Sequence, residues 1–365
     1  MTQVLVAARP TAQGRARQAF RSGIPYVLAV IGAFLVVAIL VLALGHNPLE
    51  AFRAVLTNSF RNETGMVQTL KKWVPLTLLA LAFAIPLGAG RFNIGGEGQL
   101  ILGAIGSVSV GITFSDLPQV VLLPLALVSG VLAGAIWAGI AAWLMAQFKI
   151  NEILSTVLLN FVSFELLDYL ASVVWADAGA GGAVTLPIGA GAELPTIGRP
   201  PMHIGVLIVL VLAVVAAVMA RRSVGGFELR AVGLNERAAR VHGIRTGRVA
   251  VVSMVVAGAM GGLAGAIEVA GVHHRMLEGI QSNFLLLGII IGLIARGSLT
   301  AVPFVAFGIA VLEVGAGSMQ RVSGTPVETV LILEGLILLF LLMSDVVSGR
   351  LRVRTARAKA KAAPA

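Results

Sequence analysis

Long apolar runs follow one another along almost the whole chain, and short polar stretches separate them. A helix needs roughly 20 apolar residues to cross a bilayer core about 30 Å thick, and most of these runs approach that length. We therefore predict an all-α polytopic membrane protein, with about ten transmembrane helices in one membrane domain over residues 25–345. The predicted helices cover residues 24–44, 73–90, 98–114, 120–147, 153–174, 204–220, 249–271, 284–295, 299–315 and 327–343.

Basic residues gather in segments that these alternating helices place on one side of the membrane. Residues 1–24 carry four arginines and no acid, residues 221–248 are rich in arginine, and residues 346–365 form a basic tail. Cytoplasmic loops carry an excess of Lys and Arg, so we predict that both termini and the 221–248 loop lie in the cytoplasm. The tail would lie against anionic lipid headgroups. This placement accounts for the net charge of +10 without a nucleic acid partner.

The composition excludes several kinds of chemistry. The chain is 58% hydrophobic and 12% charged, with a mean hydropathy of +0.95 and no cysteine, so thiolate sites and disulfides are absent. It has no G-x-x-x-x-G-K-[ST] loop to hold a nucleotide phosphate, and we expect no ATP hydrolysis by that route. The adjacent His273 and His274 cannot face one point on a helix. We predict no metal site, no cofactor and no enzyme activity, because no catalytic set converges on one membrane face.

Two segments predicted to lie outside are long. In residues 45–72, Leu49, Phe52, Leu56 and Phe60 recur at helical spacing among polar residues, which predicts an amphipathic helix at the membrane interface. Residues 175–202 are rich in Gly, Ala and Pro. They predict a flexible external loop that could meet a partner.

The decapeptide "RFNIGGEGQL" at residues 91–100 breaks the apolar pattern with Asn93, Glu97 and Gln99. Backbone without helical hydrogen bonds survives at membrane depth only inside protein or beside a water-filled cavity. One interpretation is a tight cytoplasmic turn, in which Glu97 and Gln99 cap the next helix. The other is a discontinuous helix whose freed amides face a solute.

A second polar cluster begins a later helix, in "KINEILSTVLLN". Asn151 and Glu152 start it, and Ser155, Thr156 and Asn160 follow. Residues 152, 156 and 160 are spaced by four and share one face. Such a face either lines a path for polar solutes or forms hydrogen bonds between helices.

Three acids, Glu268, Glu313 and Glu334, fall in or near apolar runs. Each must be paired, protonated or in contact with water. Ion-coupled secondary transport, with these acids as proton relays, is therefore one alternative function.

The 221–248 loop contains a short predicted helix. Asn235 is a good N-cap, Glu236 follows in the first turn, Ala238 and Ala239 favour helix, and Gly243 is placed to end it. A plain arginine-rich loop would not need such an ordered helix. The pattern favours a docking surface.

Three stretches together resemble the membrane permease subunits of bacterial ABC importers, in the branched-chain amino acid and simple sugar permease superfamily. They are "FNIGGEGQ", "NEILSTVLLN" and "GFELRAVGLNERAARVHGI", and the resemblance covers roughly residues 25–345. The first two are closest to the nucleoside branch, which depends on a BmpA-type solute-binding lipoprotein. The resemblance implies transport of nucleosides, with simple sugars or branched-chain amino acids as alternatives.

The resemblance also implies a location in the bacterial cytoplasmic membrane and several partners. These are a cytoplasmic ABC ATPase that binds ATP and Mg, a second and non-identical permease subunit, and an extracytoplasmic solute-binding lipoprotein. The resemblance also favours the second interpretation of the broken segment, a discontinuous helix near residues 91–99. The implied substrate-pathway residues are Asn93, Glu97, Gln99, Asn151, Glu152, Ser155, Thr156 and Asn160. The implied ATPase-coupling residues are Gly226, Arg230, Gly233, Asn235, Glu236, Ala238, Ala239 and Gly243.

Overall fold

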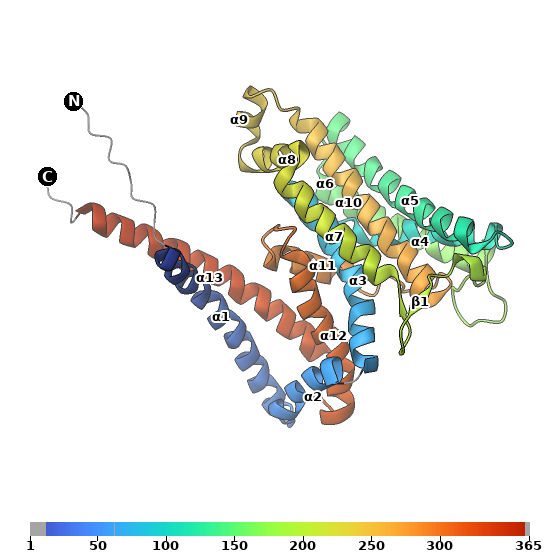
Figure 1. Cartoon of the computed structure of the whole chain (residues 1–365), viewed down its shortest axis with the longest axis horizontal. Coiled ribbons are helices and arrows are strands. Elements are labelled where there is room, and N and C mark those ends of the chain that lie inside the picture. Colours follow the sequence, from blue (N-terminus) through green and yellow to red (C-terminus); the bar gives the residue numbers. More distant parts are fainter. Residues whose placement is uncertain (1–11, 62, 362–365) are drawn as a thin grey trace. The chain divides into compact units, whose positions relative to one another are not determined.

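The computed structural model describes residues 12–61 and 63–361. Helices make up nearly all of the regular secondary structure of these residues (Figure 1). The helices are α1 (Ala12–Ala43), α2 (Pro48–Arg61), α3 (Glu63–Leu87), α4 (Gly96–Thr113), α5 (Gln119–Phe148), α6 (Glu152–Tyr169), α7 (Gly205–Arg222), α8 (Val224–Leu234), α9 (Glu236–Val241), α10 (Thr246–Glu268), α11 (Phe284–Ile294), α12 (Val302–Ser323) and α13 (Glu328–Lys361). Single π-helical turns extend α6 (Leu170–Val174) and α10 (Val269–His273), and a 3-10 turn covers Ala190–Ala192.

Each predicted transmembrane run overlaps one of these helices. Within the described residues, six helices are long and apolar enough to cross a membrane, and counting α1 with α2 as one bent pair gives seven. α11 has only 11 residues, and α4 opens with Glu97 and Gln99, which lower its hydropathy. The chain is an all-α polytopic membrane protein, and the ten crossings stay a prediction. The basic segments at 1–24 and 346–365 fall partly outside the described residues, and their described parts belong to α1 and α13.

The chain divides into two compact units. One comprises residues 1–52 and 319–365, in which α1 packs against α13 and the Phe34 and Phe52 rings meet edge to face with centroids 5.2 Å apart. The other comprises residues 53–318. There α3 and α10 are mostly buried, whereas α5, α6 and α7 expose most of their apolar side chains, as helices facing lipid or another membrane protein do.

Glycines let the central helices of the larger unit approach closely. α10 packs against α3, α4 and α5, and α4 packs against α5. A Cβ on Gly262 of α10 would collide with the carbonyl oxygen of Gly130 in α5, and one on Gly134 of α5 would collide with Gly258. In membranes such small residues replace the hydrophobic effect by allowing tight van der Waals contact between helix backbones.

The predicted helix in residues 45–72 is confirmed as α2, which has Leu49, Leu56 and Phe60 exposed. The expectation of a loose loop at 175–202 is wrong. There β1 (Thr196–Ile197) pairs with β2 (Met202–His203) in an antiparallel hairpin. Backbone N–H groups of Ile188 and Leu194 donate to carbonyls of residues 274 and 270, so the segment is fixed to the end of α10.

Candidate functional site

The helix break after α3 combines a turn with a short non-helical stretch. Residues 88–90 form the turn, residues 91–95 have no regular secondary structure, and α4 begins at Gly96. The Asn93 side-chain amide donates to the Ala82 carbonyl at 3.1 Å, so residue 93 lies beside α3. The depth of this segment in the membrane stays a prediction.

Asn160 of α6 binds the break from the side. Its amide nitrogen donates to the Ile94 carbonyl at 2.8 Å, and its oxygen accepts from the Gly98 N–H at 2.9 Å. Gly95 provides no side-chain cap for α4, so Asn160 satisfies an amide that the helix start would leave free. Asn160 lies eight residues past the start of α6, about 12 Å along its axis. α4 thus begins about two turns inside the end of the bundle.

Asn93 and Gln99 form a reciprocal amide pair in the core of the break. The Gln99 nitrogen donates to the Asn93 oxygen at 2.8 Å, and the Asn93 nitrogen donates to the Gln99 oxygen at 3.0 Å. The Asn93 oxygen also accepts from the Gly95 N–H. With its bond to Ala82, Asn93 uses two donors and two acceptor positions, which is its full capacity. Asn93 therefore braces the break, and its predicted role in the pathway stays a prediction.

The other predicted pathway residues differ in whether their polar groups already form hydrogen bonds. Asn151 caps α6 by accepting from the N–H groups of Ile153 and Leu154, and the hydroxyls of Ser155 and Thr156 donate back to carbonyls of their own helix. Glu97 is half-buried and forms no hydrogen bond or ion pair with any other described residue.

Beside Gly98, the indole nitrogen of Trp137 is buried and has no hydrogen-bond partner in the described structure. The sequence pattern did not single out Trp137, because a lone aromatic residue in an apolar run does not indicate a functional site.

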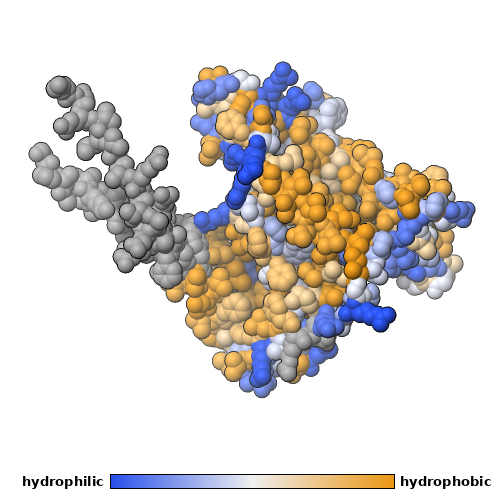
Figure 2. Space-filling model, viewed as in Figure 1, coloured by the Kyte–Doolittle hydropathy of each residue, from blue (hydrophilic) through white to orange (hydrophobic). Residues whose placement is uncertain are grey.

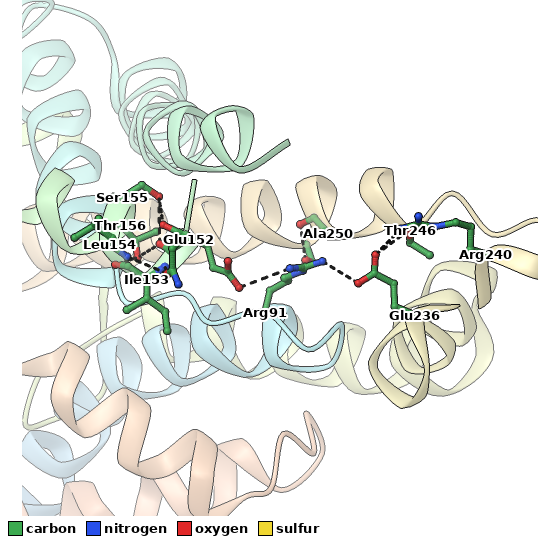
Figure 3. Close-up of polar contacts among 12 residues, drawn as sticks. Arg91, Glu152, Ile153, Leu154, Ser155, Thr156, Glu236, Arg240, Thr246 and Ala250 are labelled. Carbon is green, nitrogen blue, oxygen red and sulfur yellow. Dashed lines mark hydrogen bonds and ion pairs between the residues drawn. The ribbon is translucent and has the colours of Figure 1, made fainter. Parts of the chain in front are cut away.

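A chain of ion pairs joins the break to the predicted docking helix (Figure 3). One Arg91 nitrogen lies 3.1 Å from the Glu236 carboxylate in α9, and another lies 4.0 Å from Glu152 of α6. Glu236 also accepts from Arg240 at 2.9 Å and from the Thr246 hydroxyl at 3.3 Å. Arg91 was quoted in the motif but not predicted to act. Its signal is that it is the one basic residue in the decapeptide.

The predicted docking helix is present as α9. The Asn235 side chain accepts from the Ala238 N–H at 3.0 Å, and Gly243 takes a φ of +84° that favours glycine and ends the helix. Arg230 and Ala238 are exposed, as a docking surface requires.

Ala239 and Gly226 instead face the protein. Ala239 is 5% exposed and packs with Ala89 of the turn and Val232 of α8. Gly226 is buried against the end of α7, whereas Gly233 is exposed, although a Cβ on it would collide with the Gly88 carbonyl oxygen. The expectation that Ala239 faces a partner is therefore wrong, because the helix needs one small side chain to pack on the turn. That contact is a second link between α9 and the break.

The three acids in or near apolar runs have different surroundings. Glu313 lies 3.5 Å from Lys72, and Glu268 lies 3.5 Å from the ring of His273. Glu334 is fully buried in α13.

Comparisons with known proteins agree with the resemblance in the sequence. Residues 65–342 match the family described as branched-chain amino acid transport system, permease component. The chain is 35% identical over 333 residues to a glucose ABC transporter permease of Haloferax volcanii, which covers 87% of each chain. It is 30% identical to a guanosine ABC transporter permease of Bacillus subtilis, over 87% of this chain and 92% of the relative. It is 29% identical to a nucleoside ABC transporter permease of Lactococcus lactis subsp. cremoris, over 88% and 91%.

The family match covers the larger unit from residue 65 onward and extends into α13. It includes the broken segment, the Asn160 brace and α9 together. The chain belongs to the permease components of ABC transport systems of the branched-chain amino acid type.

Proposed function

We propose that this permease forms the translocation path of an importer for nucleosides in the bacterial cytoplasmic membrane. The observation that carries the substrate class is the similarity to guanosine and nucleoside permeases over about nine tenths of the chain. Its partners are a cytoplasmic ABC ATPase that binds ATP and Mg, a second and non-identical permease subunit, and an external solute-binding lipoprotein. The membrane domain crosses the bilayer ten times, with both termini in the cytoplasm.

The ATPase docks on α9 and the residues around it. Leu234, the last residue of α8, is 88% exposed, and Val241, the last residue of α9, is 82% exposed. Exposed arginines lie between them in the chain. These two large apolar side chains lie in a basic loop, outside the apolar helices. A protein partner that covered them would remove their apolar surface from water and so stabilise the complex.

Two contacts transmit movement of the ATPase from α9 to the pathway: the Arg91–Glu236 ion pair and the packing of Ala89 on Ala239. They join α9 to residues 89 and 91, and the non-helical residues that follow are held by Asn93 and Asn160. A displacement of α9 therefore moves the start of α4. Glu97, with free carboxylate oxygens, and the unpartnered Trp137 N–H are the groups best placed to meet ribose hydroxyls or base edges as α4 moves.

The docking surface is tested by co-purification of the ATPase with Leu234→Ser/Val241→Ser. We expect a loss of about ten-fold or more in bound ATPase, since exposed apolar anchors dominate such interfaces. The matched control is Val120→Ser, because Val120 is 86% exposed but begins α5 on the predicted external side. Equal ATPase recovery with the double variant and the control would contradict the docking surface.

The substrate is tested with the assembled importer in proteoliposomes that contain ATP. We expect ATP-driven uptake of labelled guanosine that unlabelled nucleosides inhibit. The 35% identity to a glucose permease favours a simple sugar as the second candidate, and ATP-driven glucose uptake without guanosine uptake would replace the nucleoside assignment. Uptake by this chain alone, driven by a pH gradient, would instead support proton relay by Glu268, Glu313 or Glu334.

A further inference from the structure

A cavity of about 630 Å³ lies between α7 and α10. Its walls are mainly apolar and include Leu212 and Val215 of α7 and Val252, Val256 and Met260 of α10. None of the polar pathway residues lines it. Such walls suit hydrocarbon better than a nucleoside, whose hydroxyls and base edges would find few partners there.

The cavity opens on the outer face of the helix bundle. Val215, Met219 and Val252, all in its lining, are each between 44% and 57% exposed. Figure 2 shows hydrophobic surface over α7 and α10, with hydrophilic residues near α8 and α9 at one end. In a membrane protein, a sideways opening between two apolar helices meets lipid chains.

One end of the cavity is basic. Arg245 and Arg248 line it at the start of α10, and Glu228 of α8 is its one acidic lining residue. Among the described residues, neither guanidinium forms an ion pair or hydrogen bond. The N-terminal end of α10 adds the positive end of a helix dipole. α7 ends beside this region in Arg221 and Arg222, so the arginine-rich end faces the cytoplasmic leaflet.

We propose that this cavity binds an anionic phospholipid of the cytoplasmic leaflet. An acyl chain lies between α7 and α10, and the phosphate lies against Arg245 and Arg248. Glu228 accepts a hydrogen bond from a headgroup hydroxyl, as phosphatidylglycerol offers. The surplus of one positive charge at this end favours an anionic lipid over a zwitterionic one.

The bound lipid also contacts the docking segment. Gly225, Gly226 and Leu229 of α8 line the same cavity, one helix before α9. The site does not depend on the proposed substrate or on the ATPase.

Native mass spectrometry of the full chain, released from nanodiscs with equal phosphatidylglycerol and phosphatidylethanolamine, tests this proposal. We expect selective retention of phosphatidylglycerol, and about thirty-fold weaker retention by Arg245→Gln/Arg248→Gln, which corresponds to about 2 kcal/mol for two arginines. The matched control is Arg221→Gln/Arg222→Gln, which removes the same charge outside the cavity lining. Val252→Trp fills the apolar part, keeps both arginines and should also reduce retention.

Three outcomes would overturn the proposal. They are equal lipid loss from the two double-arginine variants, equal retention of the two lipids, and displacement of the lipid by inorganic phosphate. The last would show a free anion site instead of a lipid site. Variants are compared at matched monodispersity on size exclusion, so that misfolding is not read as lipid loss.

Discussion

Replacing Asn160 by leucine should destabilise the bundle far more than an ordinary polar substitution in a membrane helix. Asn160 is 6% exposed, and its amide makes two hydrogen bonds to backbone groups of another segment. Leucine has a similar volume but removes both bonds. The Gly98 N–H then sits in the first turn of α4 without an acceptor, because the Ile94 carbonyl four residues earlier belongs to the non-helical stretch and does not accept from it. The Ile94 carbonyl loses its donor as well.

The magnitude follows from what is left behind. A side-chain hydrogen bond between membrane helices is worth about 0.6 kcal/mol on average, because the reference state also finds partners. A buried polar group without any partner costs about 1–3 kcal/mol. Two orphaned backbone groups at a helix break belong to the second case. We expect Asn160→Leu to lower the free energy of unfolding by about 3 kcal/mol or more.

Ser163→Ala is the matched control. Ser163 is fully buried one turn further along α6, but its hydroxyl donates at 2.6 Å to the Asn160 carbonyl of its own helix. That carbonyl keeps its place in the helical ladder when the hydroxyl is lost. The cost should therefore stay below about 1 kcal/mol.

The measurement is reversible unfolding of the full chain in lipid bicelles, with hydrogen exchange of residues 94–99 as a local readout. Asn160→Leu should speed exchange of the Gly98 amide selectively. If both variants lose the same stability, or if exchange at Gly98 is unchanged, the cross-helix cap is not what holds the break.

Three further predictions follow from single contacts. Arg91→Gln and Glu236→Gln should each reduce solute-stimulated ATP hydrolysis by the assembled importer without reducing ATPase binding. A double-mutant cycle should give a coupling energy of about 0.5–1 kcal/mol for this half-exposed pair. Additive effects of the two substitutions would contradict the link. Burial, then Lys71 and His274, lower the pKa of His203 to about 4, so the unfolded chain takes up a proton below about pH 6.5 and the native chain does not. Stability should thus fall by about 2 kcal/mol from pH 7 to pH 5, and His203→Phe should flatten this slope; the same slope in the variant would refute the assignment. Gly262→Ala should lower the free energy of unfolding by about 1–3 kcal/mol, because the new Cβ would meet the α5 backbone. Gly308→Ala, with open space at its Cβ, should raise the free energy of unfolding slightly. Thermal unfolding of the two variants compares them directly.

Local chemistry in the sequence identified those features whose partners are near in the chain. The N-cap at Asn235 and the stop at Gly243 depend on contacts within four residues, and each is present. The helices at 48–61 and in the apolar runs likewise follow from patterns of spacing. The transport family followed from three short stretches, because their order and separation are specific even where each alone is not.

The roles that sequence reasoning missed depend on partners far along the chain. Spacing by four placed Thr156 and Asn160 on one face, but it could not tell whether that face meets water or the backbone of Ile94, 66 residues away. The same limit applies to Ala239, which is small because Ala89 packs on it, and to Arg91, whose carboxylate partner is 145 residues away. A polar residue in an apolar helix therefore has two physical interpretations, a solute contact or a brace for broken backbone. In this structure the hydrogen bonds of Asn93 form a brace. The oxygens of Glu97 form no hydrogen bond or ion pair with another described residue, and for that reason Glu97 is the residue of the motif in the proposed solute contact.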